Sequence, residues 1–305
     1  MDGIHNISLI STGNAFYTFA GNKMMKIVYK LTFFLFGLLL SCVGSAQDGL
    51  EGIIVEKFYV STEADNAGKM YSGDLPKGSV TYRIYVDLKP GYRFQAAYGS
   101  PTHPLIIESS ENFFNHIESG NTHPNIIPER TYKKNVAMLD SWLSVGACGE
   151  GHLGILKAYD DTMRDEFIVF EKGYFGNKKK IIPLYEKDGM KRSAFVPFPV
   201  IFNMDSLFSV LGSTTRSKKL IIDNGGWAFL GKGSVGADSL STNCVLIAQL
   251  TTHGSLNFEL NLQITSPNGS SERYVAKNPM KEESEFTHPD LIFNSENKKN
   301  KPKKK

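Results

Sequence analysis

Apolar and polar residues alternate through two long segments of the chain, 80–88 and 256–264. In each of them five apolar side chains occupy every second position, and the residues between are mainly polar or charged. Successive side chains of a strand point to opposite faces. The pattern therefore predicts two half-buried strands, each with one face on a core and the other in water.

Shorter apolar runs between turn residues predict more strands. They lie at 53–60, 94–98, 105–108, 141–145, 167–171, 219–222, 244–250 and 273–275. The dipeptide Asn268-Gly269 is the clearest hairpin signal, and helix is expected only over 130–138 and 204–211. Many short strands with few short helices predict an all-β fold, an antiparallel β-sandwich of jelly-roll or immunoglobulin-like type.

The start of the chain has the features of a secretory signal peptide. Three lysines precede the apolar run 31–40, and Gly44-Ser-Ala46 provides a small-residue cleavage site. As a helix this run would span about 15 Å, half of a bilayer core of roughly 30 Å, so it is not a membrane span. Residues 1–46 are therefore predicted to be an upstream extension plus signal peptide. Translation is expected to start at Met24 or Met25, and the mature protein at Gln47.

A lipidation site competes with this cleavage site. Leu39-Leu-Ser-Cys42 resembles a lipobox, in which Cys42 would be lipidated and kept on a membrane. Both alternatives predict an exported protein that is secreted, periplasmic or associated with the outer membrane. A lipid anchor is the only membrane contact expected.

Net charge differs between the predicted parts of the chain. The whole sequence has a net charge of +3, and its last eight residues include six lysines. We expect one β-sandwich domain over 47–294 and a disordered, Lys-rich tail over 295–305. Because the body is mildly acidic without this tail, no specific nucleic-acid partner is expected.

Two of the three cysteines, Cys148 and Cys244, belong to the predicted mature chain. An even number in an oxidising compartment favours a disulfide between them. The alternative is two separate buried thiols. Cys148 and His152 also have the residue types of a nucleophile and its base, but their spacing does not provide an orienting third group, so a structural cysteine is preferred.

Two further motifs suggest ligands. Residues 149–154 match G-x-G-x-x-G, the dinucleotide fingerprint, but no second βαβ unit follows, and a glycine-rich hairpin loop is preferred. The acidic run 160–166 is an alternative calcium site without the D-x-D-x-D-G pattern. No cofactor and no other metal are expected, because the histidines lack H-x-H or H-E-x-x-H spacing.

Aromatic residues near turns suggest a sugar-binding surface. Tyr92 and Tyr98 follow a tight turn, and Trp227 follows two glycines. Exposed aromatic rings on a β-sandwich can stack on sugars, whereas most aromatic rings lie in cores. Tyr92, Tyr98 and Trp227 are the candidate ligand-binding residues, and Trp142 is assigned to the core.

Several segments together resemble a family of uncharacterised β-rich modules from secreted proteins of gliding and marine Gram-negative bacteria. The segments are 49–55, 80–99, 139–146, 224–230, 233–238 and 245–264. The resemblance implies an exported β-rich module and brings no established activity. Such modules often precede a type IX secretion sorting domain. This sequence ends in lysines instead, which favours periplasmic or lipid-anchored residence.

These observations predict a non-catalytic exported β-sandwich with a ligand-binding, adhesive or structural role at the cell envelope. Its expected partner is a glycan or another envelope component. No convergent set of acid, base and nucleophile is evident, so no catalytic residue is assigned. The alternative is a secreted hydrolase acting on polysaccharide, which would need two carboxylates facing one cleft.

Overall fold

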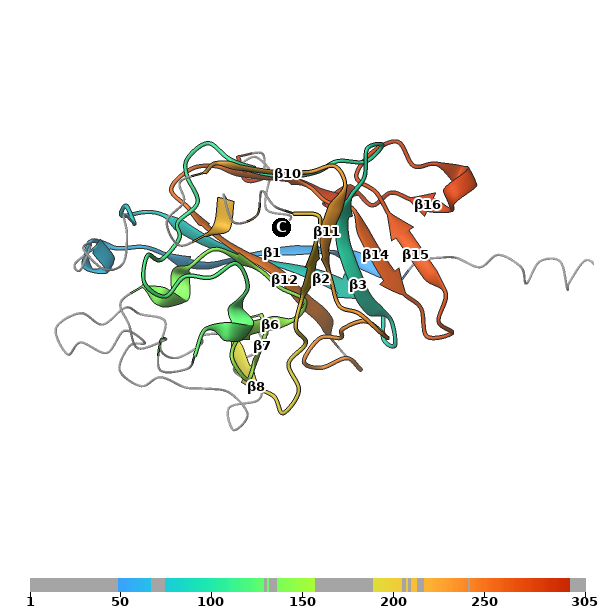
Figure 1. The fold of residues 1–305 in the computed structure, drawn as a ribbon, viewed down its shortest axis with the longest axis horizontal. Coiled ribbons are helices and arrows are strands. Elements are labelled where there is room, and N and C mark those ends of the chain that lie inside the picture. The colour runs from blue at the N-terminus through green and yellow to red at the C-terminus, as the bar shows by residue number, and fades with distance from the viewer. Residues whose placement is uncertain are drawn as a thin grey trace, which may run out of the picture. The chain divides into compact units, whose positions relative to one another are not determined.

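The computed structural model describes residues 49–66, 75–128, 131, 136–156, 189–204, 207, 210–212, 217–240 and 242–296. These residues form a mostly β structure with several antiparallel sheets and no helix of seven residues or more (Figure 1). The short 3-10 helices in this part of the chain are η1 (Glu63–Asn66), η2 (Pro124–Ile126), η4 (Ala137–Leu139), η7 (Lys281–Glu283) and η8 (Pro289–Leu291).

Sheet A consists of the long strands β1, β2 and β12 and the short strand β5, in the order β1-β2-β12-β5. Its strands run over Leu50–Val60 (β1), Val80–Leu88 (β2), Asn243–Thr252 (β12) and Trp142–Leu143 (β5). All pairs in this sheet are antiparallel. β2 has the bounds that its alternating pattern predicts.

Two further sheets, B and C, are built from strands that follow one another along the chain. Sheet C has the order β10-β4-β13-β17, and sheet B the order β16-β15-β14-β3-β11-β9. Sheet C comprises Lys219–Ile222 (β10), Leu105–Ser109 (β4), Leu256–Glu259 (β13) and Ile292–Asn294 (β17). Sheet B comprises Glu285–Phe286 (β16), Ser271–Tyr274 (β15), Leu262–Thr265 (β14), Arg93–Gly99 (β3), Gly225–Ala228 (β11) and Val200–Phe202 (β9).

Three of the chain's passages between these two sheets join strands at matching positions. β3 leads into β4, β10 into β11, and β13 into β14, so the order β10-β4-β13 in sheet C matches β11-β3-β14 in sheet B. The predicted strand 256–264 is therefore two strands, separated by a corner at Leu260 and Asn261. The hairpin predicted at Asn268-Gly269 is confirmed between β14 and β15.

Both faces of sheet A are covered. The apolar positions of β2 face a large core cluster shared with strands of sheets B and C. A second cluster, including Tyr85, Trp142 and Leu246, covers the opposite face. The prediction that the second face of 80–88 lies in water is therefore wrong, and Thr81, Arg83 and Tyr85 are buried. Residues distant in sequence supply the covering layer, which alternation within one strand cannot reveal.

Part of that covering layer is the small sheet of β6 (Ala147–Gly149), β7 (His152–Gly154) and β8 (Met190–Arg192), in the order β6-β7-β8. β6 and β7 form an antiparallel hairpin. The G-x-G-x-x-G segment is thus a glycine-containing hairpin, as the preferred interpretation predicted. Trp142 is buried, which confirms its assignment to the core.

Several predictions concern residues that the structure does not describe. These are the signal peptide with Cys42, the acidic run 160–166, the strand 167–171 and most of the tail. Of the two expected helices, Leu207, Val210 and Leu211 are helical in 204–211, and η4 lies at the end of 130–138. Among the described residues, no helix is both long and apolar enough to cross a bilayer.

Candidate functional site

Trp227 belongs to the core, which corrects its interpretation as a sugar-stacking residue. Its side chain has 0% exposure, and its indole Nε1 donates a hydrogen bond to Ser144 O at 3.0 Å. Its partner in the register is Ala97 of β3, so the ring points into the layer between the sheets. A buried ring offers no face to a ligand.

The two tyrosines do not complete an aromatic platform either. Tyr92 is partly buried against the core cluster, and its ring lies over Gly49, where an added side chain would collide with it. Tyr98 follows Ala97 on β3 and so lies on the face of sheet B opposite to Trp227. The structure therefore does not bring the three predicted aromatic residues together on one surface.

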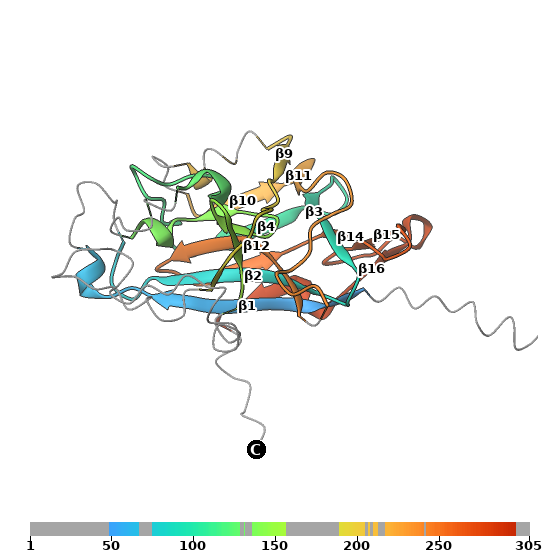
Figure 2. The same cartoon turned by 90° about the horizontal axis from the view of Figure 1, so that it is seen from below.

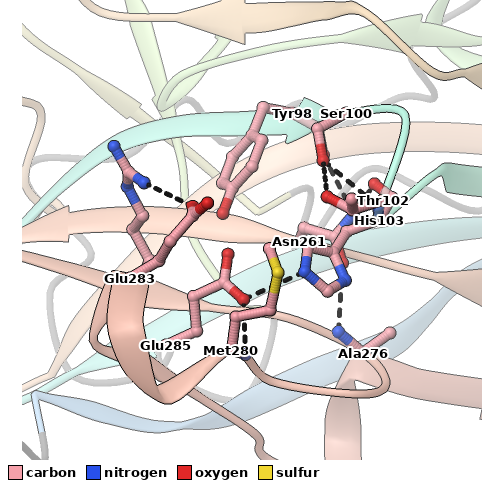
Figure 3. Close-up of polar contacts among 10 residues, drawn as sticks. Tyr98, Ser100, Thr102, His103, Asn261, Ala276, Met280, Glu283 and Glu285 are labelled. Carbon is pink, nitrogen blue, oxygen red and sulfur yellow. Dashed lines mark hydrogen bonds and ion pairs between the residues drawn. The ribbon is translucent and has the colours of Figure 1, made fainter.

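Tyr98 instead belongs to a polar cluster at the corner between sheets B and C (Figure 3). Asn261, at the corner itself, donates from Nδ2 to Tyr98 O at 3.2 Å and to His103 O at 2.7 Å. Its Oδ1 accepts from Ala276 N at 3.0 Å. One buried side chain thereby fixes three backbone segments at the point where the strands change sheet.

A buried contact between a histidine and a glutamate lies beside Asn261. His103 Nε2 and Glu285 Oε2 are 2.9 Å apart, with side-chain exposures of 5% and 2%. Glu285 also accepts from Met280 N at 2.9 Å. These contacts fasten β16 to the corner loop, so we regard the pair as structural.

The hydroxyl of Tyr98 points toward Glu283 and Glu285 (Figure 3). It is buried and has no hydrogen-bond partner. Burial, with the nearby charge of Glu285, raises the pKa of Tyr98 to about 12. Burial therefore keeps the phenol of Tyr98 neutral at neutral pH, and a neutral phenol is a poor base and a poor nucleophile.

The outer face of sheet C is more open to a ligand. A hollow of about 310 Å³ lies against β10, β4, β13 and β17. Side chains on this outer face form two rows across the sheet, because the register aligns them from strand to strand. One row is Lys219, Glu108, Asn257 and Asn294, and the other is Ile221, Ile106, Glu259 and Ile292. We call these eight residues the sheet C face.

Charged and amide groups dominate the first row of the sheet C face. Lys219 Nζ lies 2.8 Å from Glu108 Oε2, and Glu259 Oε1 in the second row lies 2.6 Å from Lys277 Nζ. Between the two pairs, Asn257 Oδ1 is buried without a hydrogen-bond partner. An unused acceptor is costly unless a ligand or water bonds it. Asn257 is therefore the residue of this face with unmet hydrogen-bonding capacity.

Both cysteines of the predicted bridge are buried thiols that form no disulfide in the structure. Cys148 Sγ lies 3.8 Å from His152 O, and Cys244 Sγ lies 3.2 Å from Asp87 Oδ1. The predicted disulfide is thus not formed here, and the alternative of two separate thiols describes the arrangement. Burial raises the pKa of Cys244, and Asp87 raises it further. His152 Nδ1 contacts Glu150 O at 2.6 Å.

The described residues contain no group of three or more His, Cys, Asp and Glu side chains placed to hold a metal ion. The alternative calcium site at 160–166 lies outside the described part. Comparisons of the chain with family models, with curated proteins and with solved structures yield no match. The assignment of the sheet C face as the candidate site is therefore based on its geometry alone.

Sequence patterns missed this face for a physical reason. Alternation places Asn257 and Glu259 on the polar side of a strand, and that signal was available. The pairing of Glu108 with Lys219 joins strands more than a hundred residues apart. Such pairing depends on the strand order, which no local pattern specifies.

Proposed function

We propose that the chain is an exported, non-catalytic β-sandwich module that binds a glycan of the cell envelope on the sheet C face. The sandwich assignment, of jelly-roll or immunoglobulin-like type, is supported by the core cluster shared between sheet A and sheets B and C. Export is supported by the signal-peptide pattern of residues 1–46 and by the resemblance to modules of secreted proteins.

The unmet acceptor of Asn257 is the observation on which the glycan proposal depends. Sugars present hydroxyl donors along an extended chain, and Asn257 lies between two ion pairs that offer further donors and acceptors. Once its side chain turns toward the hollow, Oδ1 can accept from a sugar hydroxyl. Ile106 and Ile292 in the second row add apolar contact for the C–H faces of the rings.

The alternative function is hydrolysis of a polysaccharide. Glu108 and Glu259 are diagonal neighbours on β4 and β13, a relation that separates residues by roughly 7–8 Å, and two such carboxylates are what a glycosidase needs. Each of them, however, forms an ion pair with a lysine. A catalytic carboxyl group must present its oxygens to the scissile bond, whereas each of these carboxylates already contacts a lysine amine. This pairing favours binding over hydrolysis.

A glycan array probed with the full chain tests the proposal. Asn257→Ala should abolish the signals that the unaltered chain gives. Lys77→Ala serves as the control, because it breaks an exposed ion pair with Glu63 outside the sheet C face and should leave those signals unchanged. Equal signals from all three proteins would contradict binding at this face, and release of reducing ends from a bound glycan would support the hydrolase instead.

A further inference from the structure

The turn between β14 and β15 presents an asparagine that is followed by glycine. β14 and β15 lie side by side in both Figure 1 and Figure 2, and Asn268 and Gly269 in the turn between them are exposed. Gly269 has a φ of +88°, and no atom lies within 4 Å of the place where a Cβ would be. Solvent therefore reaches this dipeptide.

An asparagine before glycine can lose its side-chain amide. The backbone nitrogen of the glycine attacks Cγ of the asparagine, its proton passes to water, and a cyclic succinimide forms as ammonia leaves. Water then opens the ring at one of its two carbonyl groups, which yields aspartate or isoaspartate. Glycine favours this reaction because it has no Cβ to hinder the movement of its nitrogen. The local geometry then decides how fast a given pair reacts.

The side chain of Asn268 is already folded toward the attacking nitrogen. Its Oδ1 accepts from Ser270 N at 2.9 Å. A side-chain oxygen bonded to the N–H two residues further on forms an Asx turn, which closes the side chain over the intervening peptide group. That peptide group contains Gly269 N. Holding two reacting groups close together lowers the barrier between them.

Hydrogen-bond donors on Asn268 Oδ1 also favour the attack. Ser266 Oγ donates to this oxygen as well, and it shares its proton with Ser270 O at 3.0 Å. Negative charge develops on Oδ1 when Gly269 N adds to Cγ, so the two donors act as those of an oxyanion hole do. Gly269 N–H donates to Ser266 O at 2.9 Å, and this bond must open first. Because it lies in an exposed turn, its opening costs little.

The chain has a second asparagine–glycine pair, Asn224-Gly225, which is held differently. Gly225 is buried at the start of β11, where it pairs with Gly99 of β3. On its other side, a Cβ would collide with the backbone oxygens of Phe202 and Asn203. A glycine packed between two strands cannot move its nitrogen toward the asparagine side chain. This pair is therefore a control within the same protein.

We propose that Asn268 is a site of spontaneous deamidation in the folded protein and that the β14–β15 turn promotes the reaction. Deamidation adds a negative charge, and isoaspartate also adds a backbone atom to a turn that sets the register of β14 with β15. It thereby alters the hairpin that carries Glu272 and Tyr274, whose side chains accept from Gly49 N. This site is separate from glycan binding on the sheet C face.

Peptide mapping of the full chain after storage in mildly alkaline buffer tests the proposal. Isoaspartate is identified by its labelling with an isoaspartyl methyltransferase. In the native chain, Asn268 should convert about tenfold faster than Asn224 or more, a difference in barrier of at least ~1.4 kcal/mol. In denaturant the two pairs should convert at similar rates, because the folded geometry is lost. Conversion of native Asn268 at the rate of native Asn224, or more slowly, would overturn the proposal.

Ser266→Ala tests whether the turn itself promotes the reaction. The backbone hydrogen bonds of the turn remain in this variant, so its unfolding midpoint should stay close to that of the unaltered chain. Conversion of native Asn268 should slow about tenfold, the effect of one hydrogen bond lost from the transition state, and the rate in denaturant should not change. Ser193→Ala, which removes an exposed hydroxyl bonded to Phe195 O, is the matched control. An unchanged or faster rate in native Ser266→Ala would contradict promotion by the turn.

Discussion

Arg83 donates from Nε to Gln249 Oε1 at 2.9 Å, across β2 and β12, on the face of sheet A that alternation assigns to water. The guanidinium lies 3.6 Å above the ring of Phe58, and its NH1 donates to Gly189 O at 2.8 Å. Gln249 Nε2 in turn donates to Met138 O and Asp140 O, both at 2.8 Å. Two polar side chains thus bind the covering layer to sheet A.

Replacing Arg83 should destabilise the fold strongly. Arg83→Met leaves Gln249 Oε1 and Gly189 O buried without this donor, and each buried acceptor left unsatisfied costs about 1–3 kcal/mol. Arg273→Met, which removes an exposed ion pair with Glu283, should cost about 1 kcal/mol or less. Urea unfolding of both variants measures the difference. Similar losses would contradict a structural role for the Arg83 network.

Trp227→Ala should also destabilise the protein, by about 3–5 kcal/mol, because it leaves a cavity in the core. Trp227→Phe retains most of the volume and loses the hydrogen bond to Ser144 O, so its loss should be smaller. Thermal unfolding should give a lower midpoint for Trp227→Ala than for Trp227→Phe. An Ala variant as stable as the unaltered chain would place the indole outside the core.

Asp140 should give the fold a distinctive pH dependence. Burial raises the pKa of Asp140 to about 8, against the opposing effect of backbone N–H groups of His116, Asn121 and Ser141. A folded-state pKa above the unfolded value of about 3.9 means that the folded state binds the proton more tightly. This contribution to stability is complete below about pH 4 and declines as pH rises to about 8.

Asp140→Asn removes that titration. The stability of the variant relative to the unaltered chain should therefore improve as pH rises from about 4 to about 8. Denaturant unfolding at several pH values tests this expectation. A difference in stability that does not change with pH would mean that Asp140 does not titrate in this range.

The two buried cysteines should react only after unfolding. The thiolate is the reactive form, and burial with the charge of Asp87 raises the pKa of Cys244. Alkylation without reductant should modify Cys148 and Cys244 fully in denaturant and hardly at all in the native protein, as read by peptide mass mapping. A peptide pair linked through both cysteines would restore the disulfide that the sequence favours.

Local patterns predicted the strands better than they predicted the layers. β2 and β10 have the predicted bounds because alternation and apolar runs are properties of a single segment. The corner at Asn261 was missed, because a buried amide that bonds three distant backbone groups looks like any polar position in an alternating strand. Arg83 was assigned to water for the same reason. The sequence of a single strand reveals neither its long-range pairing partners nor a second layer that covers it.

The candidate site shows the same limit. Trp227 drew attention because of its chemistry and its glycine neighbours, yet those glycines allow the close strand contacts that bury it. A side chain at Gly226 would collide with the backbone oxygen of Ala97. The sequence provides no reason to select Asn257, because its importance depends on neighbouring residues of β4, β10 and β17.

Binding of one glycan, chosen from the array, tests the central claim most directly by isothermal titration calorimetry. The account predicts that Asn257→Ala weakens binding about tenfold or more, the effect of losing roughly 1.4 kcal/mol from a polar contact. Lys77→Ala, which breaks an exposed ion pair outside the sheet C face, should bind like the unaltered chain. Unchanged affinity in Asn257→Ala, with the fold intact, would contradict glycan binding on the sheet C face.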